Sequence, residues 1–163
     1  MDVQRPGAGS NSRNADQRAE HQALKLIARS IHSRSDLRLK LAKRGYEEPS
    51  INHALDRLEE LGYLDDAEFA RRWILSRIER KREGRGLLRV GLRRHGVPID
   101  LQEKILQECY SEEQEWDALL AEARRLIGAG ADSVGALSRR LQSRGFGPAM
   151  VRRAVEDELG LSS

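Results

Sequence analysis

The feature that most constrains the fold is a helical pattern that occurs three times. In each copy two leucines stand four residues apart, and a glycine with an apolar residue behind it follows four residues later. The copies begin at Leu37, Leu88 and Leu137, so the pattern recurs after 51 and then 49 residues. Self-similarity at such a period is typical of chains built from repeated supersecondary units that pack against their neighbours.

Each copy predicts a helix that ends at its glycine. Leucines at i and i+4 lie on one face of an α-helix, and glycine adopts the left-handed conformation that closes a helix without a Cβ penalty. Proline is accepted in the first turn of a helix, so a proline just after the glycine predicts the start of the next helix. The three glycines and the prolines that follow them are Gly45 and Pro49, Gly96 and Pro98, and Gly145 and Pro148.

Apolar stripes predict two further helices in each copy. The helix before the leucine pair carries Ala23, Leu24, Ile27 and Ile31 in the first copy, Phe69, Trp73, Ile74 and Ile78 in the second, and Leu119, Ala123, Leu126 and Ile127 in the third. The helix after the glycine carries Ile51, Leu55 and Leu58, then Leu101, Ile105 and Cys109, then Val151, Val155 and Leu159. No useful stretch alternates with a period of two, so we expect no strand.

These patterns predict an all-α fold of tandem three-helix repeats that form an elongated, solenoid-like chain. We place the repeats at residues 16–62, 63–110 and 111–160. Aromatic residues are only 4% of the chain and charged residues are 34%, which disfavours a single large core. Residues 1–15 are rich in Gly, Ser, Asn and Arg without an apolar period, and we expect them to form a disordered tail.

The sequence predicts a soluble, cytoplasmic protein. It has no apolar run near the length of a membrane span and no apolar segment typical of a signal peptide. Cys109 is the only cysteine, which fits a reducing compartment because it cannot form an intrachain disulfide.

Positive charge is concentrated in the middle of the chain. The net charge is only +3, but residues 71–95 hold ten Lys and Arg residues against two glutamates. A field of this size attracts polyanions or an acidic protein surface. Arg85, Arg89 and Arg93 are four residues apart, so we expect one exposed helical stripe that contributes little to folding. The predicted binding residues of this central run are Arg71, Arg72, Arg77, Arg80, Lys81, Arg82, Arg85, Arg89, Arg93 and Arg94.

A second, smaller basic cluster lies near the C-terminus. It consists of Arg139, Arg140, Arg144, Arg152 and Arg153. For both groups the alternative interpretation is that long arginine side chains only solvate the outer faces of helices.

Signatures of catalysis and of metal binding are absent from the sequence. Residues 84–86 (Gly-Arg-Gly) lack the spacing of a phosphate-binding loop, and the four histidines are scattered. Asp65 and Asp66 are explained more simply as a helix cap than as metal ligands. Trp73 and Trp116 fall in apolar helical patterns, which favours core packing over base stacking. We therefore expect no enzymatic activity and no cofactor.

Three stretches of the chain resemble the RecX family, regulators of the bacterial recombinase RecA. They are SRSDL at 33–37 continuing to KRG at 43–45, GYLDDAEFA at 62–70, and LQSRGF at 141–146. The resemblance covers roughly residues 20–159, and the order and spacing of the stretches are more specific than any one alone. The chain departs from the family pattern at Asp36, where Glu is common, and at Gly91, where an acidic residue is usual. A glycine inside a helix costs about 1 kcal/mol relative to alanine, and it permits close approach of another backbone.

The resemblance implies a non-enzymatic modulator built from three-helix repeats. Such a protein binds the RecA–DNA filament and suppresses its recombinase and ATPase activities, without a cofactor or a membrane, and we expect it to act as a monomer. The basic run would then meet either acidic loops of the recombinase or single- or double-stranded DNA. The alternative is a general DNA-binding protein whose short glycine turns join helix-turn-helix-like units. Against it, the repeats contain few of the Asn, Gln and Ser residues that often read base edges beside arginine.

Overall fold

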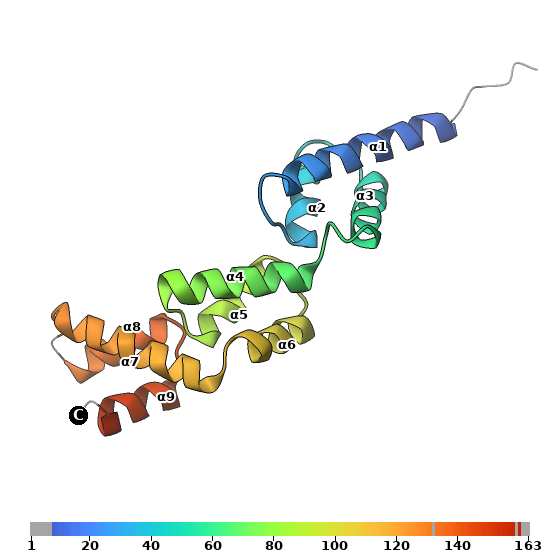
Figure 1. The fold of residues 1–163 in the computed structure, drawn as a ribbon. Helices are drawn as coiled ribbons and strands as arrows, with labels where there is room; N and C mark the ends of the chain where they lie inside the picture. The colour runs from blue at the N-terminus through green and yellow to red at the C-terminus, as the bar shows by residue number, and fades with distance from the viewer. Residues whose placement is uncertain (1–7, 132, 159, 161–163) are drawn as a thin grey trace, which may run out of the picture. The chain divides into compact units, whose positions relative to one another are not determined.

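A computed structural model of the chain describes residues 8–131, 133–158 and 160. These residues form helices and turns without a β-strand, which confirms the predicted all-α class (Figure 1). In this part of the chain the helices, in order, are α1 (Ala8–Ile27), α2 (Arg34–Ala42), α3 (Glu48–Glu60), α4 (Asp66–Lys81), α5 (Arg85–Arg94), α6 (Ile99–Cys109), α7 (Glu112–Gly128), α8 (Val134–Ser143), α9 (Pro148–Arg153) and the π-helix η1 (Ala154–Glu158).

The chain divides into two compact units, and the boundary falls inside α4, between Phe69 and Ala70. The first unit contains α1, α2, α3 and the first turn of α4. The second contains the rest of α4 and all helices from α5 onward. The predicted limits of the three repeats stay a prediction.

In the first unit, α1, α2 and α3 pack around one apolar core. This core consists of Ala23, Leu26, Leu37, Leu41, Ile51, Leu55, Leu58 and Leu64. The expected place of Ile31 in the α1 stripe is wrong, because α1 ends at Ile27 and Ile31 is 40% exposed. After α1 ends, Ser33 is the N-cap residue of α2. Its hydroxyl accepts the N–H of Asp36 at 3.0 Å.

Residues 8–15 are helical and do not belong to a disordered tail. α1 begins at Ala8, and residues 1–7 lie outside the described part of the chain. Just after this stretch, α1 meets α3 through a polar pair. Ala19 is buried, and the Ser50 hydroxyl donates to Asp16 Oδ1 at 2.6 Å. Small side chains allow close helix packing that hydrophobic periodicity does not reveal.

The three glycine turns have the predicted geometry. Gly45, Gly96 and Gly145 have φ values of 84°, 70° and 91°. In each turn the N–H of the next residue bonds to the carbonyl of the second leucine, as the helix-closing motif requires. These bonds are Tyr46 to Leu41 at 3.3 Å, Val97 to Leu92 at 3.1 Å and Phe146 to Leu141 at 3.4 Å.

The prolines after these glycines stand at the starts of α3, α6 and α9. Pro49 and Pro148 lie in the first turns of α3 and α9, and Pro98 is the N-cap residue of α6. Because proline has no N–H, each of these positions removes one of the N–H groups that a helix start leaves without an intrahelical partner.

In the second unit the buried stripe of α6 is shifted by one residue from the predicted stripe. Gln102 is buried, and its side-chain amide donates to the carbonyl of Val97 at 2.7 Å, whereas Leu101 is only half-buried. Apolar spacing alone predicts Leu101 as the buried residue, but a glutamine whose side-chain amide is hydrogen-bonded occupies the core position. Ile105 and Leu106 are buried beside it, and Cys109 is half-buried.

The third set of helices has its own apolar core. Its buried residues are Leu119, Ala123, Leu126, Leu137, Leu141, Phe146, Val151, Ala154 and Val155. Ser111 and Gln114 form the capping box at the start of α7 that their spacing predicts. Of the expected stripe residues, Ile127 is 40% exposed and Leu159 lies outside the described residues.

Two backbone segments of the second unit interlock. The N–H of Gly84 donates to the carbonyl of Arg144, and the N–H of Gly86 to that of Gly145, both at 2.9 Å. A Cβ on Gly84 would lie 2.5 Å from the carbonyl carbon of Gly145. The two glycines of the Gly-Arg-Gly segment therefore allow the loop between α4 and α5 to contact the turn between α8 and α9.

Gly91 makes room for an aromatic ring. A Cβ on Gly91 would lie 2.1 Å from atom Cη2 of Trp73, so the indole of α4 packs directly against the backbone of α5. This contact confirms the core-packing interpretation of Trp73. The sequence left two expectations for Gly91, a weaker helix or close approach of another backbone, and the structure places a side chain there instead of a backbone.

Candidate basic interface

Asp65 and Asp66, at the start of α4, both accept N–H groups at helix starts, but only Asp65 caps the following helix as the sequence predicts. Asp65 Oδ1 accepts the N–H groups of Ala67 and Glu68 at 2.8 and 3.2 Å. Asp66 Oδ1 accepts the N–H of Arg34, the first residue of α2, at 2.7 Å. Burial raises the pKa of Asp66, although this N–H bond opposes the rise. Both carboxylates are thus used in holding helix starts.

In the second unit a carboxylate again accepts the N–H of a residue at a helix start, and that residue is Arg85. Arg85 was expected to belong to an exposed stripe. Its N–H, at the start of α5, donates to Glu115 Oε1 at 2.8 Å. Its guanidinium lies 3.3 Å (Nε to Oε2) from the same carboxylate and donates to the carbonyl of Tyr110. The Arg85 side chain is 17% exposed and that of Glu115 is 6% exposed. The expectation of an exposed Arg85 is therefore wrong, because α5 uses it to bind α7.

Arg89 is also engaged within the fold. Its Nε and one terminal nitrogen donate to the two oxygens of Glu103 on α6, at 2.6 and 2.8 Å. This bond is the main reason that the pKa of Glu103 lies below its ordinary value. Of the predicted stripe, Arg93 is exposed as expected.

Two arginines of α4 contact carboxylates as well. Arg77 donates two hydrogen bonds to the buried Glu83, at 2.8 and 2.6 Å, and its guanidinium lies 5.3 Å from the ring centroid of Trp73. Arg71 forms an ion pair with Glu108 at 3.2 Å. These contacts hold the α4–α5 loop and α6 in place.

The remaining cations of the central run lie at helix surfaces. Arg72 is exposed on α4. Arg80, Lys81 and Arg82 are exposed around the end of α4, and Arg93 and Arg94 are exposed at the end of α5. The structure thus divides the predicted run into residues that stabilise the fold and residues that face solvent.

The C-terminal cluster divides in the same way. Arg139, Arg140 and Arg152 are exposed. Arg153 covers the ring of Trp116, with 4.7 Å between its guanidinium carbon and the ring centroid. Arg144 contacts Glu122 on α7.

Glu122 and Arg125 are residues that the sequence analysis missed. Glu122 is 2% exposed, and Arg125 donates to both of its oxygens at 2.8 and 2.7 Å. Arg144 Nε lies 3.5 Å from the same carboxylate. The hydrogen bond from Arg125 is the main cause that lowers the pKa of Glu122, and the charges of Arg144 and Arg82 add to it. The only sequence signal was an i, i+3 acid–base pair on one helix.

Acid should remove the stabilisation that Glu122 provides. Its pKa in the folded protein lies below the ordinary value of 4.5, so its contribution is present above that value and is lost as the pH falls through the lower folded pKa. We expect Glu122→Gln to lower the free energy of unfolding by about 2 kcal/mol near pH 7, because charged hydrogen bonds are lost in a buried site. Urea unfolding at about pH 7 and about pH 3 checks this, and an equal deficit at both pH values would contradict it.

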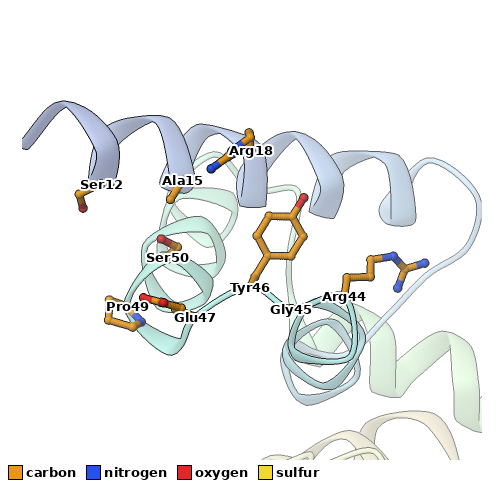
Figure 2. A pocket seen from close by; sticks show the side chains of 9 residues that line it. All are labelled: Ser12, Ala15, Arg18, Arg44, Gly45, Tyr46, Glu47, Pro49 and Ser50. Carbon is orange, nitrogen blue, oxygen red and sulfur yellow. The ribbon is translucent and has the colours of Figure 1, made fainter.

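A hollow in the first unit lies between α1 and the turn that joins α2 to α3 (Figure 2). Its volume is about 740 Å³, and Figure 2 shows the Tyr46 side chain extending from the turn toward α1. Arg18 and Arg44 line it together with Glu47, so charges of both signs face the same space. This mixture does not favour a polyanion, and we assign no ligand to the hollow.

No helix in the described ranges combines the length and apolar character needed to cross a membrane.

Comparison with known proteins matches two parts of the chain to family models. Residues 19–58 match the first three-helix domain of RecX, and residues 65–106 match the second. The first range contains the motif at 33–45, and the second contains residues 65–70 of the motif at 62–70.

Relatives cover most of the chain. It is 34% identical over 142 residues to the regulatory protein RecX of Prosthecochloris aestuarii, covering 87% of this chain and 94% of the relative. It is 37% identical over 144 residues to that of Treponema pallidum, covering 86% of each. The crystal structure of RecX from Lactobacillus salivarius has the same fold, with a TM-score of 0.80 at 16% identity over 88% of this chain and 96% of that one. The chain belongs to the RecX family of regulatory proteins.

Proposed function

We propose that this protein binds the filament that RecA forms on DNA and inhibits its ATPase and recombination activities, thereby regulating DNA repair. The observation that carries the proposal is family membership along 87% of the chain. The resemblance of the family motifs implies RecA as the partner. The protein acts in the cytoplasm as a monomer, without catalysis or a cofactor of its own.

The exposed cations support this proposal. Arg80, Lys81 and Arg82 at the end of α4, and Arg93 and Arg94 at the end of α5, are free of ion pairs among the described residues. A filament offers both DNA phosphates and acidic protein groups to such side chains. Two compact units in one chain can bind separate places on a filament, and linked contacts raise the overall affinity.

ATP hydrolysis by the recombinase tests the proposal directly. Adding the protein to RecA, ATP and single-stranded DNA should slow phosphate release in a dose-dependent way. The protein alone should release no phosphate, because it lacks a phosphate-binding loop. A rate of RecA hydrolysis unchanged at saturating protein would contradict the proposal.

A second titration separates filament binding from general DNA binding. The protein is titrated against single-stranded DNA, bare or coated with RecA and a nucleotide. We expect at least about tenfold tighter binding to the coated DNA, which corresponds to about 1.4 kcal/mol. Equal affinity for both would favour the general DNA-binding alternative.

A further inference from the structure

Four cations from three segments of the second unit lie near one buried carboxylate. Arg125 and Arg144 contact Glu122 at 2.7 and 3.5 Å, and the charge of Arg82 also acts on this carboxylate. Arg144 donates to the backbone carbonyl of Lys81 at 3.4 Å, which places the backbone at Lys81 and the next residue, Arg82, beside the Arg144 guanidinium. We call Lys81, Arg82, Arg125 and Arg144 the Glu122 cluster.

The Glu122 cluster carries more positive charge than the carboxylate neutralises. Lys81 and Arg82 are exposed and make no ion pair among the described residues. The side chains of Arg125 and Arg144 are 47% and 38% exposed, so part of each guanidinium faces solvent. An arginine has five N–H donors, and Arg125 uses two nitrogens on Glu122, so outward donors remain for an anion.

The backbone at Arg82 points to a role for its side chain. Arg82 has a φ of 48° and is the one non-glycine residue with positive φ in the described ranges, where the other such positions are glycines. A left-handed conformation is unfavourable for a residue with a Cβ. Within the described structure the Arg82 side chain is exposed and its charge acts on Glu122 from a distance, with no direct hydrogen bond or ion pair to set against this cost. Strained residues of this kind cluster at functional sites.

We propose that the Glu122 cluster binds the phosphodiester backbone of nucleic acid. The buried carboxylate holds two guanidinium groups in place, and arginine donates to phosphate oxygens in a bidentate manner. A nucleic-acid strand carries closely spaced phosphates, so each cation of the cluster can meet one. An acidic protein loop would need several carboxylates at the same spacing. The proposal rests on the proposed function only in taking filament DNA as the natural ligand.

Binding of the full-length protein to bare, fluorescently labelled DNA oligonucleotides tests the proposal. Arg82→Gly removes one cation and relieves the backbone strain. We expect it to weaken binding by about three- to tenfold and to reduce the slope of log affinity against log salt by about one, as for the loss of one phosphate contact. The melting temperature should stay the same or rise, because glycine accepts this φ. Arg82→Lys should retain most of the affinity.

Arg124→Gln is the matched control. Arg124 is an exposed arginine of α7 next to Arg125, and it lies outside the Glu122 cluster. We expect its loss to change the affinity by less than about twofold, since only the long-range field changes. If Arg124→Gln and Arg82→Gly weaken DNA binding equally, the Glu122 cluster contributes only to the overall positive charge. That result would overturn the proposal.

Binding to RecA-coated DNA distinguishes a nucleic-acid contact of the Glu122 cluster from a protein contact. If Arg82→Gly binds bare DNA like the wild type but loses binding to RecA-coated DNA, the Glu122 cluster contacts protein and the phosphate proposal is wrong. A wild-type protein that does not bind bare DNA at all would also overturn the phosphate proposal. If bare DNA binds as we expect while wild type leaves RecA hydrolysis unchanged, the proposed function fails and the phosphate site stands.

Discussion

Gly145→Ala should lower the free energy of unfolding of the second unit by about 3 kcal/mol. Gly145 has a φ of 91°, and a Cβ there would lie 2.3 Å from the backbone nitrogen of Leu87 and 2.9 Å from the carbonyl oxygen of Gly84. Backbone atoms cannot rotate away as a flexible side chain can, so the interlocked α4–α5 loop and α8–α9 turn must separate. For a unit of this size the loss corresponds to a melting temperature lower by about 10–20 °C.

Gly130→Ala separates the two parts of this effect. Gly130 has a φ of 85°, but a Cβ there would meet nothing within 4 Å. Both variants carry the left-handed penalty of about 1 kcal/mol, and only Gly145→Ala adds the clash. Thermal and urea unfolding of both variants measure the difference. Similar losses in the two would show that the interlocking contact contributes little to stability.

Arg85→Ala should destabilise the fold by about 3 kcal/mol, because the buried Glu115 carboxylate keeps the backbone N–H of residue 85 but loses the guanidinium charge that neutralises it. Arg85 binds Glu115 through both its backbone N–H and its guanidinium, and it also donates to the carbonyl of Tyr110. Replacing Arg85, Arg89 and Arg93 together should therefore lower the melting temperature markedly. The expectation from spacing alone was a nearly unchanged melting curve.

Arg93→Ala is the control on the same helix. Arg93 is exposed at the end of α5, and its loss should change the free energy of unfolding by less than about 0.5 kcal/mol. A double-mutant cycle of Arg85→Ala and Glu115→Gln isolates the coupling between the pair. If Arg85→Ala is as stable as the wild type and the cycle gives no coupling energy, the contact between Arg85 and Glu115 does not stabilise the fold. Arg85 would then behave as the solvated surface residue that the sequence suggests.

Local patterns in the sequence were enough for the helices and their turns. The leucine pairs at Leu37, Leu88 and Leu137 recur with the glycines that close each helix, and this information lies within a dozen residues of chain. Helix periodicity and left-handed glycine depend on near neighbours, so one sequence suffices to predict them. The family motifs likewise are short stretches in a fixed order. The fold class and the family were therefore predictable.

The assignment of the arginines needed tertiary structure. Arg85 and Arg93 are alike in sequence, yet one meets Glu115 on α7 and the other is exposed. Arg82 and Arg144 lie far from α7 in the sequence, and only the tertiary fold brings their charges to Glu122. The partner of a long charged side chain is set by contacts between residues distant in the chain. Residue spacing determines which face of a helix an arginine occupies, and helix packing determines whether that face meets a carboxylate or solvent.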